Sequence, residues 1–96
     1  MTIYLAEGAS YVVDLDGRIP TLKQLQELVD GWIEAVPGSR AVTDGGIAYC
    51  NEEGRSRGLL RNPLASIRFR QLLVGDVVEL TRDELDAIVA AAAAKV

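Results

Sequence analysis

The chain has 96 residues, a length that predicts one domain over residues 1–96, because two separate cores would each be too small to fold alone. Hydrophobic residues make up 49% and charged residues 25%, with a net charge of −4, which excludes a disordered chain. The chain contains no histidine and a single cysteine, Cys50, so the commonest general base, an internal disulfide and a thiolate zinc cluster are excluded.

A β-hairpin is predicted at the start of the chain. Apolar and polar residues alternate with a period of two in residues 2–7 and 10–15, as expected of strands with one buried face. Gly8 lies in the turn between them, and Asp16-Gly17 is expected to end the second strand.

An amphipathic helix is predicted over residues 21–30. Thr21 and Gln24 have the spacing of a capping box, in which each residue binds the other's main-chain N–H. Gly31 is expected to end the helix, because glycine readily takes the left-handed conformation found there. Apolar residues recur at three- and four-residue steps, and we expect them to pack in the core: Leu22, Leu25, Leu28, Val29 and Trp32.

The next part of the chain is predicted to form short strands. Residues 32–36 either extend the helix by a turn or form a strand, and we favour a strand because a Pro-Gly turn follows. Residues 40–43 and 46–50 are predicted as two strands joined by a tight hairpin turn at Asp44-Gly45.

Two further helices and a strand complete the prediction. A helix is expected over residues 63–67, although the alternation in residues 67–70 leaves a strand open there. Residues 77–80 are predicted as a strand, and residues 81–95 as a helix that begins with a second capping box. The fold class expected is therefore α+β: a small, mainly antiparallel sheet with helices at 21–30, 63–67 and 81–95.

The charges are distributed unevenly along the chain. Residues 55–70 hold five arginines and no acidic residue, a net charge of +5, which leaves −9 for the rest because the whole chain carries −4. The planar guanidinium group suits bidentate binding of phosphate and carboxylate groups. The segment is a candidate anion-binding site, although a solvated basic surface would have the same composition. Its arginines are Arg55, Arg57, Arg61, Arg68 and Arg70.

The turn before this segment holds further candidate binding residues. Asn51, Glu52 and Glu53 precede Gly54, a composition that turn geometry alone also explains. Asn62 begins the short helix that turns the chain back toward this turn. We expect the turn and the arginines to form one surface, in which Glu52 and Glu53 either gate the site or pair with arginines when it is empty.

Three segments, in this order along the chain, resemble a known family. Residues 25–36 look like its "LQ-x-x-V-x-G-x-I-E-x-V" segment, residues 51–66 like its "N-E-E-G … G-L … N-x-x-A-[ST]" segment, and residues 74–78 like its "V-G-D-V-V" segment. The family is catalogued as domain of unknown function 3846 and occurs in bacteriophages, plasmids and other mobile elements. The resemblance covers about residues 25–78 and transfers no catalytic residue. It implies a protein made in the cytoplasm of a bacterial host.

The residues favour a non-enzymatic binding protein. The chain offers no nucleophile–base pair, no phosphate loop and no set of metal ligands, so we expect neither a cofactor nor a metal. Cys50 has no histidine base and is expected to be a buried core thiol. With the resemblance, this predicts a bacteriophage accessory protein that binds a host protein or a small anionic ligand and modulates host growth or immunity.

The sequence argues against nucleic acid and membranes as partners and leaves two alternative functions. The acidity of the whole chain argues against nucleic acid as a partner. The apolar run at residues 87–94 is too short for a membrane helix, and the absence of a basic start argues against a signal peptide, which favours the cytoplasm. One alternative is a self-assembling homo-oligomer, in which the basic segment of one copy meets the acidic face of another. A second is an enzyme in which Glu52 or Glu53 acts on a phosphorylated ligand held by arginines.

Overall fold

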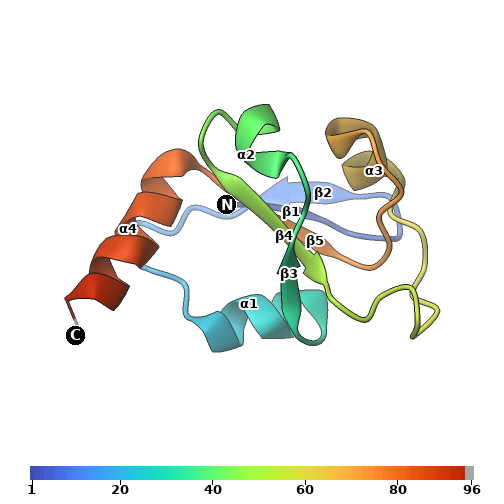
Figure 1. The fold of residues 1–96 in the computed structure, drawn as a ribbon, viewed down its shortest axis with the longest axis horizontal. Coiled ribbons are helices and arrows are strands. Elements are labelled where there is room, and N and C mark those ends of the chain that lie inside the picture. Colours follow the sequence, from blue (N-terminus) through green and yellow to red (C-terminus); the bar gives the residue numbers. More distant parts are fainter. Residues whose placement is uncertain (95–96) are drawn as a thin grey trace.

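One antiparallel sheet of five strands lies at the centre of residues 1–94, which are the residues that the computed structural model describes. Its strands follow the order β2-β1-β5-β4-β3. They are β1 (Thr2–Tyr4), β2 (Ser10–Val12), β3 (Ile33–Ala35), β4 (Ile47–Asn51) and β5 (Val77–Leu80). The helices are α1 (Leu22–Val29), α2 (Ser39–Val42), α3 (Pro63–Phe69) and α4 (Arg82–Ala93). Figure 1 shows α1 on one face of the sheet, α2 and α3 on the other, and α4 at one end. The α+β fold class is thereby confirmed.

Buried side chains pack on both faces of the sheet. Neighbouring residues of a strand point to opposite faces, so Val78 of β5 faces α1 whereas Val77 faces α3. The cluster under α1 consists of Ile3, Leu25, Val29 and Val78. The cluster under α3 consists of Val36, Ala48, Ala65, Phe69, Leu73 and Val77. The sheet thus separates two surfaces of the molecule, one on the α1 side and one on the α3 side.

The predicted capping box of α1 is confirmed, while its C-terminal end differs from the prediction. Oγ1 of Thr21 accepts a hydrogen bond from the Gln24 amide at 3.1 Å, and Oε1 of Gln24 accepts one from the Thr21 amide at 2.9 Å. The left-handed residue at the other end is Asp30, with a φ of 61°, and not Gly31. The helix therefore ends one residue earlier than predicted, and Gly31 has a different role.

Trp32 does not belong to the core, so that prediction is wrong. Its side chain is 63% exposed, because the left-handed Asp30 ends the helix and takes the tryptophan off the apolar stripe. Leu22, in the first turn of α1, is exposed as well. The strand alternative for residues 32–36 is confirmed, since β3 begins at Ile33.

The strand predicted over residues 40–43 is also wrong, because residues 40–42 lie in α2 and Thr43 is its C-cap. β4 already pairs with β3 on one side and β5 on the other, so no free edge remains for another strand. The buried hydroxyl of Ser39 accepts a hydrogen bond from the Ala48 amide at 3.1 Å and thereby attaches α2 to β4. Asp44 and Gly45 connect α2 to β4 and do not form a hairpin turn.

The N-terminal hairpin is confirmed, with shorter strands than predicted. β1 and β2 pair in antiparallel register, with Ile3 opposite Tyr11. β1 also pairs with β5, which leaves β2 at one edge of the sheet and β3 at the other.

The last two helices are confirmed. α3 continues beyond the predicted end at residue 67 to Phe69, so the strand alternative for residues 67–70 is wrong. Ala65 and Phe69, one turn apart, are both buried against the sheet and account for the longer helix. α4 begins after Thr81 with the predicted capping box. Lys95, at the end of the predicted helix, lies outside the described residues.

Within residues 1–94, no helix has the length and hydropathy that a membrane span requires.

Candidate functional site

Asn51, one of the predicted binding residues, is buried and fully used by the fold. Its Nδ2 donates hydrogen bonds to the carbonyl oxygens of Val29 and Asp30, both at 3.0 Å, at the end of α1. Its Oδ1 accepts a hydrogen bond from the Glu53 amide at 2.8 Å. The side chain therefore attaches the end of α1 to the turn after β4, and we assign it a structural role.

Asn62 has a similar structural role at the start of α3. Its side chain is fully buried, and Oδ1 accepts a hydrogen bond from the Ala65 amide at 3.0 Å, as expected of a helix cap. Its Nδ2 donates to the carbonyl oxygens of Tyr4 and Gly75, both at 2.9 Å. One amide group thus joins β1, α3 and the segment that leads into β5.

Arg57 extends to the end of α1 and pairs with Asp30. Nη2 lies 3.1 Å from Oδ2 of Asp30, and Nη1 donates a hydrogen bond to the main-chain carbonyl of the same residue. Because Asp30 follows the end of α1, Arg57 lies on the α1 side of the sheet.

The expected pairing of Glu52 and Glu53 with arginines is not found, since no ion pair within residues 1–94 involves either carboxylate.

Arg68 lies on the α3 side, in a network with Glu79 of β5. Nη2 of Arg68 is 2.8 Å from Oε2 of Glu79, and Nε donates to Oε1. The Tyr4 hydroxyl donates to the same Oε1 at 2.8 Å, and the Arg68 guanidinium lies 5.6 Å from the centre of the Phe69 ring. Burial and the hydrogen bond to Glu79 raise the pKa of Tyr4 to about 12. The arginine stabilises the contact between α3 and the sheet.

The five arginines consequently do not form one surface. Arg57 is bound to Asp30 at the end of α1, whereas Arg68 is bound to Glu79, which points to the α3 side of the sheet as Val77 does. Arg70, the left-handed residue that follows the end of α3, is exposed. Arg55 and Arg61 each line a hollowed part of the surface.

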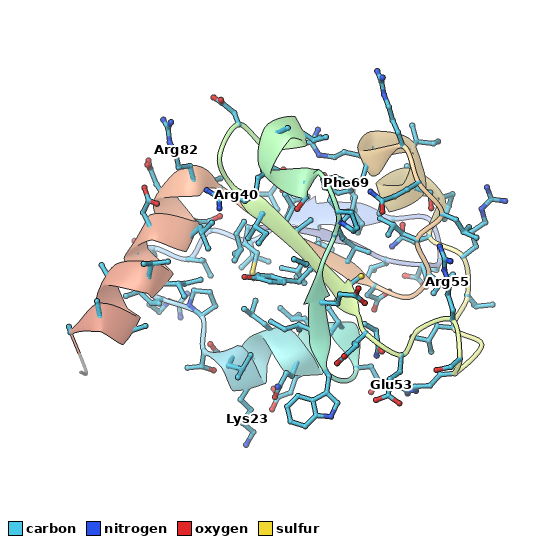
Figure 2. All side chains as sticks on the ribbon, in the orientation of Figure 1. Lys23, Arg40, Glu53, Arg55, Phe69 and Arg82 are labelled. Carbon is cyan, nitrogen blue, oxygen red and sulfur yellow. The ribbon has the colours of Figure 1, made fainter. Side chains whose placement is uncertain are left out.

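Two adjoining hollows form what we call the Arg55–Arg61 groove. The first has a volume of about 410 Å³ and is lined by Arg61, Pro63, Ser66, Ile67, Gln71 and Leu72. The second has a volume of about 310 Å³, and its lining includes Glu34, Cys50, Glu52, Arg55, Gln71 and Leu72. Because Gln71 and Leu72 line both hollows, the two lie side by side next to α3. Figure 2 shows Arg55 on this side of the molecule, away from the α4 end.

The groove presents both apolar and cationic groups to solvent. Ile67 is 76% exposed and Leu72 is 48% exposed. Nη2 of Arg55 donates to the Leu72 carbonyl at 3.1 Å, which positions the guanidinium over the groove. The Arg61 guanidinium makes no hydrogen bond or ion pair with another group in residues 1–94. The arginines are therefore available to a partner that brings acidic groups.

Cys50 packs against the core cluster under α3 but is only half-buried and lines the second hollow, so the expectation of a buried core thiol is met in part. Burial, followed by the negative charge of Glu34, raises the pKa of the thiol. The thiol is therefore protonated at neutral pH and is a weak nucleophile. Within residues 1–94, no group of three or more His, Cys, Asp or Glu side chains is arranged to hold a metal ion.

Sequence reasoning missed the apolar part of the groove, Ile67 and Leu72. A signal for Ile67 was present in the helix period. Ala65 and Phe69 lie one turn apart on the buried face, so Ile67, halfway between them, has to lie on the opposite face. Leu72 follows the helix in an irregular segment, where no periodicity indicates which side chains are exposed.

A comparison with known families finds a match that covers most of the chain. The model of the family described as "Domain of unknown function (DUF3846)" matches residues 1–90. The match extends on both sides of the three motif segments and includes most of α4. No curated protein matches the chain, and no solved structure matches it.

Proposed function

The chain belongs to the family described as a domain of unknown function (DUF3846), and from this premise we propose that it is a non-enzymatic protein-binding module. Its partner presents a segment with acidic and apolar side chains, which lies in the Arg55–Arg61 groove. The observation that carries the proposal is the exposure of Ile67 and Leu72 in the same groove as the two available arginines. Arginine and exposed apolar groups in a hollow are typical of the central residues of protein interfaces.

Two terms would stabilise such a complex. Covering exposed apolar surface contributes about 25 cal/mol per Å², and Ile67 and Leu72 offer this surface. Carboxylates of the partner would form charge-assisted hydrogen bonds with Arg55 and Arg61. The apolar contacts provide affinity, while the arginines select acidic partners and speed association.

A protein segment fits this groove better than a small anion. Glu34 and Glu52 line the same hollow as Arg55 and weaken its attraction for any anion, so a ligand that bound there through charge alone would be held weakly. The amides of Asn51 and Asn62 are used within the fold and do not add donors to the groove. An extended segment can place its carboxylates on the arginines and its apolar groups on Leu72.

The source of the partner is part of the same proposal. The family resemblance suggests a bacteriophage accessory protein that acts in the cytoplasm of a bacterial host. We therefore propose that the partner is a host protein and that binding modulates host growth or immunity.

Selection from a library of random peptides tests the binding proposal and requires no identified partner. We expect the selected peptides to be enriched in acidic and apolar residues. In fluorescence anisotropy, the double variant Arg55→Ala/Arg61→Ala should bind them at least about tenfold more weakly, a loss of about 1.4 kcal/mol, because truncating an interface arginine that contacts a carboxylate can cost more than about 1 kcal/mol. Bound peptide should also slow alkylation of Cys50, the chain's single cysteine, which lines the groove.

The control removes the same charge from another part of the surface. Lys23→Ala/Arg82→Ala changes two exposed cations outside the groove and should leave affinity within about twofold, since only long-range attraction is lost. Peptides without acidic residues, or equal binding by the two double variants, would contradict the proposal. Sedimentation equilibrium at low and high salt tests the alternative of self-association through opposite charges, because salt screens those charges and would weaken such an oligomer.

A further inference from the structure

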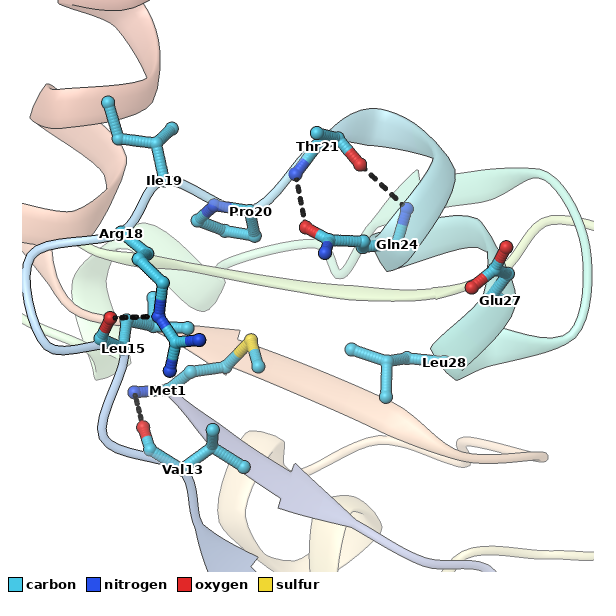
Figure 3. A pocket seen from close by; sticks show the side chains of 10 residues that line it. All are labelled: Met1, Val13, Leu15, Arg18, Ile19, Pro20, Thr21, Gln24, Glu27 and Leu28. Carbon is cyan, nitrogen blue, oxygen red and sulfur yellow. Dashed lines mark hydrogen bonds between the residues drawn. The ribbon is translucent and has the colours of Figure 1, made fainter.

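A third hollow, of about 680 Å³, lies on the α1 side of the sheet, beside the N-terminal half of α1 (Figure 3). It arises because α1 packs against β3, β4 and β5 and leaves the start of β1 to be covered by the loop after β2. Its apolar walls are formed by Met1, Val13, Leu15, Ile19, Pro20 and Leu28. The Arg55–Arg61 groove lies on the α3 side, so the two sites are separate.

Most polar groups around this hollow are already used by the fold. Thr21 and Gln24 form the capping box of α1. The amino group of Met1 lies 2.7 Å from Oε2 of Glu84 and 3.3 Å from the Val13 carbonyl. Each of these groups would have to break a hydrogen bond within the protein in order to bind a ligand.

Arg18 and Glu27 are the exceptions: the Glu27 carboxylate makes no hydrogen bond or ion pair within residues 1–94, and Arg18 is held at the hollow with donors to spare. Its Nε donates to the Leu15 carbonyl at 3.0 Å, and this bond orients the guanidinium. Its other N–H groups make no hydrogen bond or ion pair within residues 1–94. Figure 3 shows Arg18 at one side of the hollow, next to Leu15, and Glu27 at the other, beyond Leu28. The hollow therefore has a positive and a negative end.

We propose that this hollow binds a small carboxylate with an apolar body, oriented with its carboxylate on Arg18 and its body between Val13 and Leu28. The volume lies within the range of about 300–1,000 Å³ that small-molecule sites occupy, and such sites are mostly apolar with few polar groups. Arg18 supplies the fork of donors that a carboxylate accepts. Glu27 disfavours the reverse orientation, because it would repel a carboxylate at its own end of the hollow.

Octanoate and 1-octanol form a suitable pair of probes, because they share an apolar chain and differ in the head group. Methyl NMR of the protein follows binding, and we expect octanoate to shift the methyl signals of Val13 and Leu28. Arg18→Gln should weaken octanoate about tenfold by removing charge-assisted hydrogen bonds, while binding of 1-octanol stays unchanged. Arg82→Gln removes a charge from exposed Arg82 on α4 and should leave both probes unaffected.

A hollow-filling variant, Val13→Phe, provides an independent test and should abolish binding of both probes. Arg18 is exposed, so Arg18→Gln tests the proposal even if the filled variant fails to fold. Three results would overturn the proposal: no binding of octanoate at about 10 mM, equal binding of octanoate by the wild type and Arg18→Gln, or shifts confined to other methyl groups. A wild-type dimer that Val13→Phe converts to a monomer would instead make the hollow an interface between copies. Each outcome leaves the peptide-binding test unaffected, because that test uses the opposite face.

Discussion

Gly31 and Asn51 lie so close together that a β-carbon on Gly31 would be 2.7 Å from Nδ2 of Asn51. The same Nδ2 donates to the two last carbonyls of the α1 region, those of Val29 and Asp30. Gly31 also has a φ of 154°, which side-chain-bearing residues rarely adopt. Glycine at this position is therefore a condition for attaching the end of α1 to β4.

We predict that Gly31→Ala lowers the free energy of unfolding by about 2–3 kcal/mol, measured by urea denaturation, since the methyl group displaces the Asn51 amide and strains the backbone. Gly58→Ala is the matched control. Gly58 has a φ of 68°, but a β-carbon on it would have no atom within 4 Å, so only the backbone cost of about 1 kcal/mol applies. Equal losses in the two variants would show that the contact with Asn51 is unimportant.

Asn62→Ala is predicted to cost about 3 kcal/mol or more of unfolding free energy. The change removes three hydrogen bonds and leaves the carbonyls of Tyr4 and Gly75 without this donor in a buried site. Thr21→Ala removes a cap of the same type from an exposed position and should cost only about 1 kcal/mol. Similar losses in chemical denaturation would contradict the assigned role of Asn62 as a junction between β1, α3 and the segment before β5.

Alkaline pH is predicted to destabilise the protein through Tyr4. Its pKa in the folded state is about 12, above the value of about 10 expected in the unfolded chain. The contribution to stability is therefore complete below about pH 10 and is lost as the pH rises toward 12. Tyr4→Phe should remove part of this alkaline loss in urea midpoints measured across the range. Tyr11→Phe, on the edge strand, is the control, and an equal effect there would argue against the burial of Tyr4 and its hydrogen bond to Glu79 as the cause.

Acid pH is predicted to act through Glu84. Burial alone would raise the pKa of this carboxyl, but hydrogen bonds from the amino group of Met1 and the amide of Thr81 outweigh it and lower the pKa. The contribution to stability is thus complete above the ordinary pKa of about 4.3 and is lost as the pH falls through the lower folded value. Glu84→Gln should flatten the decline of thermal stability below about pH 4.5. Asp86→Asn, exposed on the same helix, should change it little.

The local elements of this fold were predictable from the sequence, because the signals that define them act within one turn of chain. Both capping boxes and the Asn62 cap link residues three positions apart, so spacing alone reveals them. The alternation in the N-terminal hairpin is equally local. For the candidate site, the concentration of arginines in residues 55–70 identified Arg55 and Arg61, although not which arginines remain available to a partner.

Only the tertiary structure decided the rest, since those features depend on residues distant in the sequence. Residues 40–42 lie in a helix and not in a strand because β5, from near the end of the chain, occupies the edge of β4. The arginines separate because Asp30 and Glu79, on opposite sides of the sheet, bind Arg57 and Arg68. The groove and the hollow beside α1 exist because short helices cover the sheet incompletely. Long-range pairing and packing set these outcomes, and a four-residue pattern carries no information about which distant segment will become its neighbour.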